Sequence, residues 1–118
     1  TTSNVLSFCL NYLARNTVIQ DCLRSKLNDA YPNGEKDILI QGLNGIEKIT
    51  YLTHFVNEVH RICPLAGVPR ECIEDTVING YPIKKGESVL ISNRTIGLRE
   101  DYWKGMKDLD IFRPERWA

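Results

Sequence analysis

The sequence has no excess of charge of either sign and no long hydrophobic run. Lysine plus arginine and aspartate plus glutamate each number 15 among 118 residues, so the formal net charge is zero. Binding to nucleic acid or to an anionic membrane surface favours a basic protein, and we therefore expect no nucleic-acid partner. A helix that crosses a bilayer needs about 20 apolar residues, and a signal peptide needs a basic stretch before an apolar one. Neither pattern occurs.

Paired cysteines, internal repeats and low-complexity tracts are also missing. The four cysteines show no C-x-x-C spacing, so we expect no zinc knuckle, redox pair or other metal site in this segment. Cys9, Cys22 and Cys63 fall at apolar helix positions, which predicts buried thiols and a reducing compartment. The length suits one domain. Because the chain begins at Thr1 without an initiator methionine and stops at Ala118 without a polar tail, we interpret it as a segment of a larger protein.

The clearest helical pattern lies in residues 51–64. Its apolar residues recur at the spacing of a helix with one buried face; they are Leu52, Phe55, Val56, Val59 and Cys63. The polar side contains His54, Glu58 and Arg61, and a carboxylate and a guanidinium three residues apart can meet on a helix surface. Considered alone, this pair is most simply a solvated ion pair worth a few tenths of a kcal/mol.

Two further helices are predicted before this one. Residues 1–14 have an apolar stripe that is broad enough for burial on more than one side. A second helix extends over residues 17–30, where residues 17–20 have the form of a capping box and Asn16 is the competing cap. A turn at residues 32–34 ends it.

The second half of the chain predicts a small β region. Prolines exclude a helix over residues 64–69, and residues 76–83 are typical of a hairpin around a two-residue turn at Asn79 and Gly80. The remaining assignments are a short strand or helix within 37–48, a strand at 88–92, a helical turn at 100–103 and an irregular segment at 111–117. The predicted fold class is therefore mainly α with a small β-sheet (α+β).

Several short motifs follow one another in a characteristic order. Glu58 and Arg61 form E-x-x-R, which Pro64 closes, and residues 112–117 fit the pattern F-x-P-E-R-[FW]. Arg70 and the hairpin sequence lie between them. This ordered set resembles the cytochrome P450 family of haem-thiolate monooxygenases. The resemblance implies a partial cytochrome P450 fold over residues 1–118, from the end of the I helix through the J and K helices and the β region to the meander.

The resemblance implies an ion lock made by Glu58, Arg61 and Arg116. In the family the corresponding glutamate and arginines interlock. A buried carboxylate between two guanidinium groups satisfies their forked donors, and the loss of one partner leaves an uncompensated charge. The implied role is structural, because the lock anchors the loop with the haem ligand and does no chemistry. For Arg116 considered alone, the alternative is a surface arginine.

The resemblance also implies contacts with haem and substrate. Arg70 takes the place of an arginine that pairs with a haem propionate, and its alternative is a surface arginine at a strand edge. Thr1 takes the place of the I-helix threonine that helps to deliver protons to bound dioxygen, and its alternative is a frayed terminal residue. In the family, one apolar segment passes over the haem and touches the substrate. It corresponds here to Leu65, Ala66, Gly67 and Val68, for which plain packing is an equal explanation.

The family's axial cysteine is absent from this segment, because no cysteine lies in the F-x-x-G-x-R-x-C-x-G context. For the parent protein, the resemblance implies haem as cofactor and the insertion of one oxygen atom from dioxygen into a small lipophilic substrate. The implied electron donor is an NADPH-dependent flavoprotein reductase or a ferredoxin. A typical eukaryotic parent would lie on the cytosolic face of the endoplasmic reticulum membrane. The segment alone is expected to be inactive and to fold poorly.

Two other interpretations are open from the sequence. One is a small α+β binding or scaffold domain that uses the face of His54, Glu58 and Arg61 for a partner and does not need Arg116 near Glu58. The other is a truncated gene product without a function. Replacement of Arg116 would separate the first of these from the ion lock.

Overall fold

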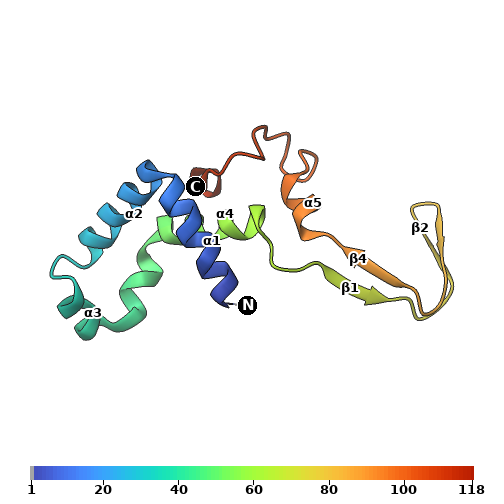
Figure 1. The fold of residues 1–118 in the computed structure, drawn as a ribbon, viewed down its shortest axis with the longest axis horizontal. Coiled ribbons are helices and arrows are strands. Elements are labelled where there is room, and N and C mark those ends of the chain that lie inside the picture. Colours follow the sequence, from blue (N-terminus) through green and yellow to red (C-terminus); the bar gives the residue numbers. More distant parts are fainter. Residues whose placement is uncertain (1) are drawn as a thin grey trace.

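A computed structural model describes residues 2–118 as a helical body from which a β arm projects (Figure 1). The molecule measures 61 × 31 × 22 Å along its principal axes. Within the described part of the chain, no helix combines the length and apolar character needed to cross a membrane. The α-helices are α1 (Thr2–Arg15), α2 (Thr17–Ala30), α3 (Glu35–Gln41), α4 (Thr50–Ile62) and α5 (Asn93–Leu98). The predicted fold class, mainly helical with a small β region, is confirmed.

The junction between α1 and α2 differs from the predicted capping box. Thr17 is the first residue of α2, and Asn16 occupies the cap position without a side-chain capping bond. The Asn16 side-chain amide instead donates to the Tyr12 carbonyl at 2.8 Å, which satisfies an acceptor at the end of α1. The capping-box prediction is therefore wrong, because the side chain at the junction serves the preceding helix.

The ambiguous segment 37–48 forms no strand. It divides between α3 and a 3-10 helix, η1 (Gly42–Lys48). Gly42, at the end of α3, has φ +61° and ψ −153°, a backbone conformation that is open essentially to glycine alone.

The core forms where α4 meets α1, α2 and the segment that follows α5. Phe55 and Val59 of α4 are almost completely buried and pack against Leu23 of α2. Tyr12 of α1 stacks on Phe112 with ring centroids 4.2 Å apart, and Phe55 meets the same Phe112 ring edge-on at 5.6 Å. The predicted helix at residues 51–64 and its apolar face are confirmed.

The β arm consists of two separate two-stranded antiparallel sheets. In one, β1 (Val68–Glu71) pairs with β4 (Ser88–Ile91), so that Arg70 is opposite Val89. In the other, β2 (Thr76–Ile78) and β3 (Tyr81–Ile83) form the predicted hairpin. Asn79 and Gly80 have φ +49° and +85°, as a type I′ turn requires at both central residues. The third predicted strand therefore pairs with β1 and not with the hairpin.

The helix α5 is not predicted from the sequence, because the apolar run at residues 88–92 places Ser92 in the preceding strand. Ser92 is its N-cap, and its hydroxyl accepts from the Thr95 backbone N–H at 3.3 Å. Gly97 of α5 lies so close to α4 that a Cβ atom there would be 2.5 Å from the Arg61 carbonyl oxygen. The irregular segment predicted at 111–117 ends in a 3-10 helix, η2 (Pro114–Trp117).

Much apolar surface remains uncovered in this chain. On α1, Leu6 and Leu10 are 57% and 59% exposed. Cys9, Cys22 and Cys63, predicted to be buried, are each only partly buried, because the helices cover one another on one side only. The radius of gyration is 19.2 Å, whereas a compact domain of this length would have about 13–14 Å.

The purified 118-residue chain is therefore expected to unfold without a sharp thermal transition. Its exposed helix faces and thin β arm bury too little apolar area to offset the conformational entropy of ordering the chain. Circular dichroism during heating, with a dye that binds exposed apolar surface, measures this directly. A steep cooperative transition with no dye binding before it would contradict the expectation.

Candidate functional site: a buried carboxylate between two arginines

Glu58 of α4 lies at the centre of the most densely bonded site in the described residues. Its side chain is fully buried and accepts five hydrogen bonds. Oε1 accepts from Arg61 Nη2 at 2.7 Å, from the Arg113 backbone N–H at 2.9 Å and from Arg116 Nε at 2.9 Å. Oε2 accepts from Arg61 Nε at 2.8 Å and from Trp117 Nε1 at 3.0 Å. The carboxylate thus joins α4 to η2.

Arg61 is the bidentate partner of this carboxylate. The two residues lie three positions apart on α4, so both side chains leave the helix on the same face. The opposite edge of the guanidinium reaches three backbone oxygens. Arg61 Nη1 donates to the Gly97 and Leu109 carbonyls at 2.8 and 2.6 Å, and Nη2 also donates to the Ile111 carbonyl at 3.3 Å. One buried cation on α4 therefore binds three backbone carbonyls from the part of the chain that follows β4.

Arg116 supplies the second cation from η2. Besides its bond to Glu58, its Nη2 donates to the Asp108 and Ile111 carbonyls, each at 2.9 Å. Its Nη1 is buried and has no hydrogen-bond partner among the described residues. Both carbonyls belong to the segment formed by residues 99–117, which we call the meander. This arginine therefore folds the meander on itself as well as onto Glu58.

Two tryptophans enclose one side of the cluster. Arg61 lies 5.7 Å from the ring centroid of Trp103, at the distance of a cation–π contact. Trp103 meets Trp117 edge-on with centroids 5.2 Å apart. Both rings reduce the access of water to the ion cluster, and a lower local dielectric strengthens the charge interactions.

The site holds Glu58 in its ionised form. Burial alone would raise the pKa of this carboxyl, but the hydrogen bonds from Arg61, the Arg113 N–H, Arg116 and Trp117 outweigh it and lower the pKa below its ordinary value. A carboxylate that is saturated with donors is a poor base and has no free lone pair for a substrate. The arrangement is suited to holding the meander in place rather than to proton transfer.

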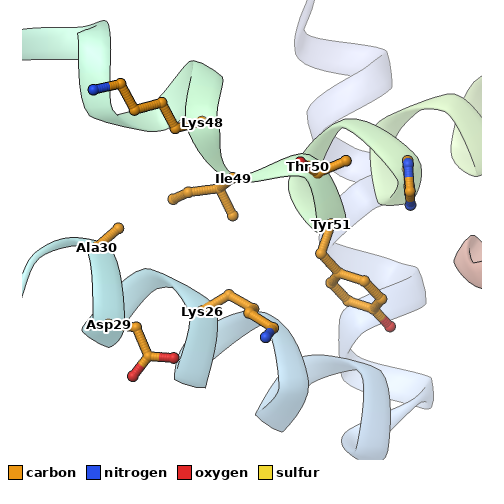
Figure 2. A pocket seen from close by; sticks show the side chains of 8 residues that line it. Lys26, Asp29, Ala30, Lys48, Ile49, Thr50 and Tyr51 are labelled. Atoms are coloured by element: carbon orange, nitrogen blue, oxygen red, sulfur yellow. The ribbon is translucent and has the colours of Figure 1, made fainter. Parts of the chain in front are cut away.

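The structure brings Glu58, Arg61 and Arg116 together. The alternative of a partner-binding face made of His54, Glu58 and Arg61 is not supported, because the last two side chains are buried. Near His54 there is a surface pocket of about 610 Å³ between α2 and the start of α4. Figure 2 shows that its lysines, Lys26 and Lys48, extend in different directions, so their charges do not converge on one ligand.

Two of the predicted haem and substrate residues, Leu65 and Ala66, line a surface pocket of about 590 Å³ together with Arg61 of the ion cluster. Arg70 is exposed on β1, where its Nη1 donates to the Pro69 carbonyl at 2.8 Å. The Ala66 carbonyl accepts from Asn93 Nδ2 at 2.8 Å. A Cβ at Gly67 would lie 2.7 Å from the Ile91 carbonyl oxygen, so packing against β4 is sufficient to explain this glycine. Leu65, Gly67 and Val68 are half-buried and Ala66 is exposed. Thr1 lies outside the described residues.

The donor set fits part of a haem site. The exposed Arg70 guanidinium has N–H groups available for a carboxylate such as a propionate, and an apolar segment precedes it. The described residues contain no group of three or more histidine, cysteine or acidic side chains that could hold a metal ion. Cys63 Sγ lies 3.7 Å from the Tyr12 hydroxyl oxygen. The burial of Tyr12 and its contact with Cys63 raise its pKa to about 12.

Most of the partners that surround the ion cluster give no signal in the sequence. The acceptors at Gly97, Asp108, Leu109 and Ile111 are backbone carbonyls, for which no residue type gives a signal. The Arg113 donor is likewise a backbone N–H. The role of Trp117 could have been found, because its position beside Arg116 is part of the motif and a buried indole N–H usually has a partner.

The whole chain is similar to proteins of one family. The family model described as Cytochrome P450 matches residues 1–118. Cytochrome P450 3A9 of Rattus norvegicus is 37% identical over 122 residues, and Cytochrome P450 3A6 of Oryctolagus cuniculus is 34% identical over 119 residues. Each alignment covers all of this chain and 22% of the relative.

A solved structure is similar over the same range. The crystal structure of a cytochrome P450, CYP102L1, matches all of this chain and 26% of that chain, with a TM-score of 0.77 and 25% sequence identity. The chain thus spans about a quarter of the length of each of these three proteins. From the matched family model and these relatives, we conclude that the chain belongs to the cytochrome P450 family.

Proposed function

We propose that this chain is the segment of a haem-dependent monooxygenase that holds the meander onto α4 through an ion lock. The observation that supports the proposal is the fully buried Glu58 carboxylate with five donors, two of them from Arg61 and one from Arg116. A saturated carboxylate of this kind has a structural role. Its proposed effect is to fix the position of the loop that brings the haem ligand.

The residues that would meet haem are on the β arm and the segment before it. Arg70 would pair with a propionate, and residues 65–68 would lie along the macrocycle and the substrate. When it is bound, haem supplies the activation of dioxygen, and a thiolate ligand favours cleavage of the O–O bond. This chain would bind and orient the haem and the substrate, and would exclude water from them. Thr1 is the proposed proton-delivery residue.

The proposed reaction of the whole protein is the insertion of one oxygen atom from dioxygen into a small lipophilic substrate. The electrons would come from an NADPH-dependent flavoprotein reductase or a ferredoxin. For a parent that is a typical eukaryotic member of the family, the proposed location is the cytosolic face of the endoplasmic reticulum membrane. The 118-residue segment by itself is proposed to be inactive, because its cysteines lack the context of the family's axial ligand.

The full-length protein that contains this chain is expected to bind haem and to give the reduced carbon monoxide spectrum of a thiolate-ligated iron. Arg70→Ala is expected to weaken haem retention roughly tenfold or more, as for the loss of a hydrogen bond between charged groups. Titration of the apoprotein with haem measures this affinity. Arg24→Ala is the control, since Arg24 is exposed and pairs only with Asp21 and Gln20 on its own helix. Unchanged haem retention in Arg70→Ala would argue against the propionate contact.

A further inference from the structure

The two oxygens of the Glu58 carboxylate are satisfied in different ways. Among the described residues, Oε1 has three donors, two of them from cations, whereas Oε2 has two, Arg61 Nε and Trp117 Nε1. The indole therefore supplies half of the hydrogen bonds to Oε2. Without it, a buried carboxylate oxygen would keep a single donor, and an undersatisfied buried charge is costly.

The charge of the cluster favours a neutral donor at this position. Glu58 contributes one negative charge, and Arg61 and Arg116 contribute two positive charges that are both buried. A third cation at Oε2 would add repulsion between like charges in a medium of low dielectric constant. An indole N–H donates a hydrogen bond without adding charge. Trp117 thus supplies the second donor to Oε2 without adding a positive charge to the cluster.

Trp117 also joins the meander to α4 by a route that does not pass through Arg116. Its ring meets Trp103 edge-on at 5.2 Å, and Trp103 lies 5.7 Å from Arg61. Its N–H reaches Glu58 directly at 3.0 Å. The end of η2 therefore reaches α4 directly through the hydrogen bond to Glu58, and indirectly through Trp103, which lies against Arg61.

We propose that Trp117 is a positioning residue that acts through Glu58: its indole N–H orients the carboxylate and keeps the meander in the arrangement that binds haem. This inference rests on the proposed function of the ion lock. It predicts that the hydrogen bond, and not only the volume of the indole, determines how firmly the meander is held.

The test compares Trp117→Phe with Trp103→Phe in the full-length protein. Both changes replace an indole of the same cluster with a smaller phenyl ring, but of the two tryptophans only Trp117 donates a hydrogen bond to Glu58. Trp117→Phe is expected to reduce the folded-to-unfolded ratio at pH 7 about tenfold, equal to about 1.4 kcal/mol. Urea unfolding also measures how much the free energy of unfolding increases from acid to neutral pH. This increase should be smaller in Trp117→Phe than in the unmodified protein, whereas Trp103→Phe should show the same increase as the unmodified protein.

The sign follows from the low pKa of Glu58 in the folded state. A lowered pKa stabilises the fold above the unfolded pKa, and this contribution is lost as the pH falls through the folded pKa. The charged groups that face Glu58 are Arg61 and Arg116, which stay charged over this range. Removal of the indole donor brings the folded pKa closer to the unfolded pKa, so the pH-dependent part of the stability decreases.

A third variant keeps the test decisive if Trp117→Phe fails to fold. Benzothienylalanine at position 117 preserves the shape of the indole and replaces only the N–H with sulfur. It should reproduce the smaller pH-dependent gain and a lower haem content per folded protein. The inference would be overturned if this variant kept the full increase in stability from acid to neutral pH. It would also be overturned if the two phenylalanine variants lost equal amounts of that increase. Absence of haem from the unmodified protein would instead refute the proposed function.

Discussion

Replacement of Glu58 by alanine in the full-length protein is expected to lower the free energy of unfolding by about 3–5 kcal/mol, the usual range for breaking a buried ion pair. Urea unfolding of the two proteins at pH 7 measures the difference. A typical domain has a total stability of about 5–15 kcal/mol. The variant is therefore expected to be partly unfolded at physiological temperature and to retain little haem.

The size of this effect comes from what the substitution leaves behind. Arg61 and Arg116 are both buried, and each would lose its carboxylate partner while remaining charged. The Arg113 backbone N–H and the Trp117 indole N–H would lose an acceptor in the same step. Because all of these groups depend on one carboxylate, the effects of their separate removal are not additive.

Asp21→Ala provides the matched control for the loss of a carboxylate. Asp21 also pairs with an arginine three residues away on a helix, with 2.6 Å between Asp21 Oδ1 and Arg24 Nη1, but the Asp21 side chain is 70% exposed. Solvent and salt screen such a pair, so its loss is expected to cost less than about 0.5 kcal/mol. Equal effects of Asp21→Ala and Glu58→Ala would mean that Glu58 acts as an ordinary surface pair and would refute the ion lock.

The fold could be predicted from the sequence where a local pattern coincides with a tertiary contact. On α4 the apolar face packs in the core, and the E-x-x-R pair lies on the polar side of the predicted helix. The apolar spacing and the spacing of the pair therefore indicate the same helix. The hairpin was predictable because Asn79 and Gly80 adopt the positive φ angles that the turn requires. In both cases the residues that specify the structure are neighbours in sequence.

Prediction failed where a side chain serves a distant or unexpected partner. Asn16 and Ser92 are both residues that commonly cap helices, but Asn16 bonds backward to Tyr12 and Ser92 starts a helix immediately after a strand. The surroundings of Arg61 depend on carbonyls at positions 97, 109 and 111, whose directions are set by α5 and the folded meander. The burial of Glu58 is therefore a tertiary property, and local helix spacing alone favoured a solvated pair.

Arg116→Ala is expected to cost about 3–4 kcal/mol, again because it breaks a buried pair. Glu58 would retain Arg61, so the remaining charge is not isolated, but the carbonyls of Asp108 and Ile111 would lose their shared donor. The meander should loosen more than the helices. Limited proteolysis at residues 99–113, together with urea unfolding, measures the local and the global effect.

Arg113→Ala is the control for this substitution. Arg113 is exposed and belongs to the same segment, and its contact with Glu58 is made by the backbone N–H, which alanine keeps. Its removal is expected to change the stability by less than about 0.5 kcal/mol. If both arginines were ordinary surface residues of a small binding domain, both variants would resemble the unmodified protein. A large effect at position 116 alone requires that the guanidinium itself holds the meander to Glu58.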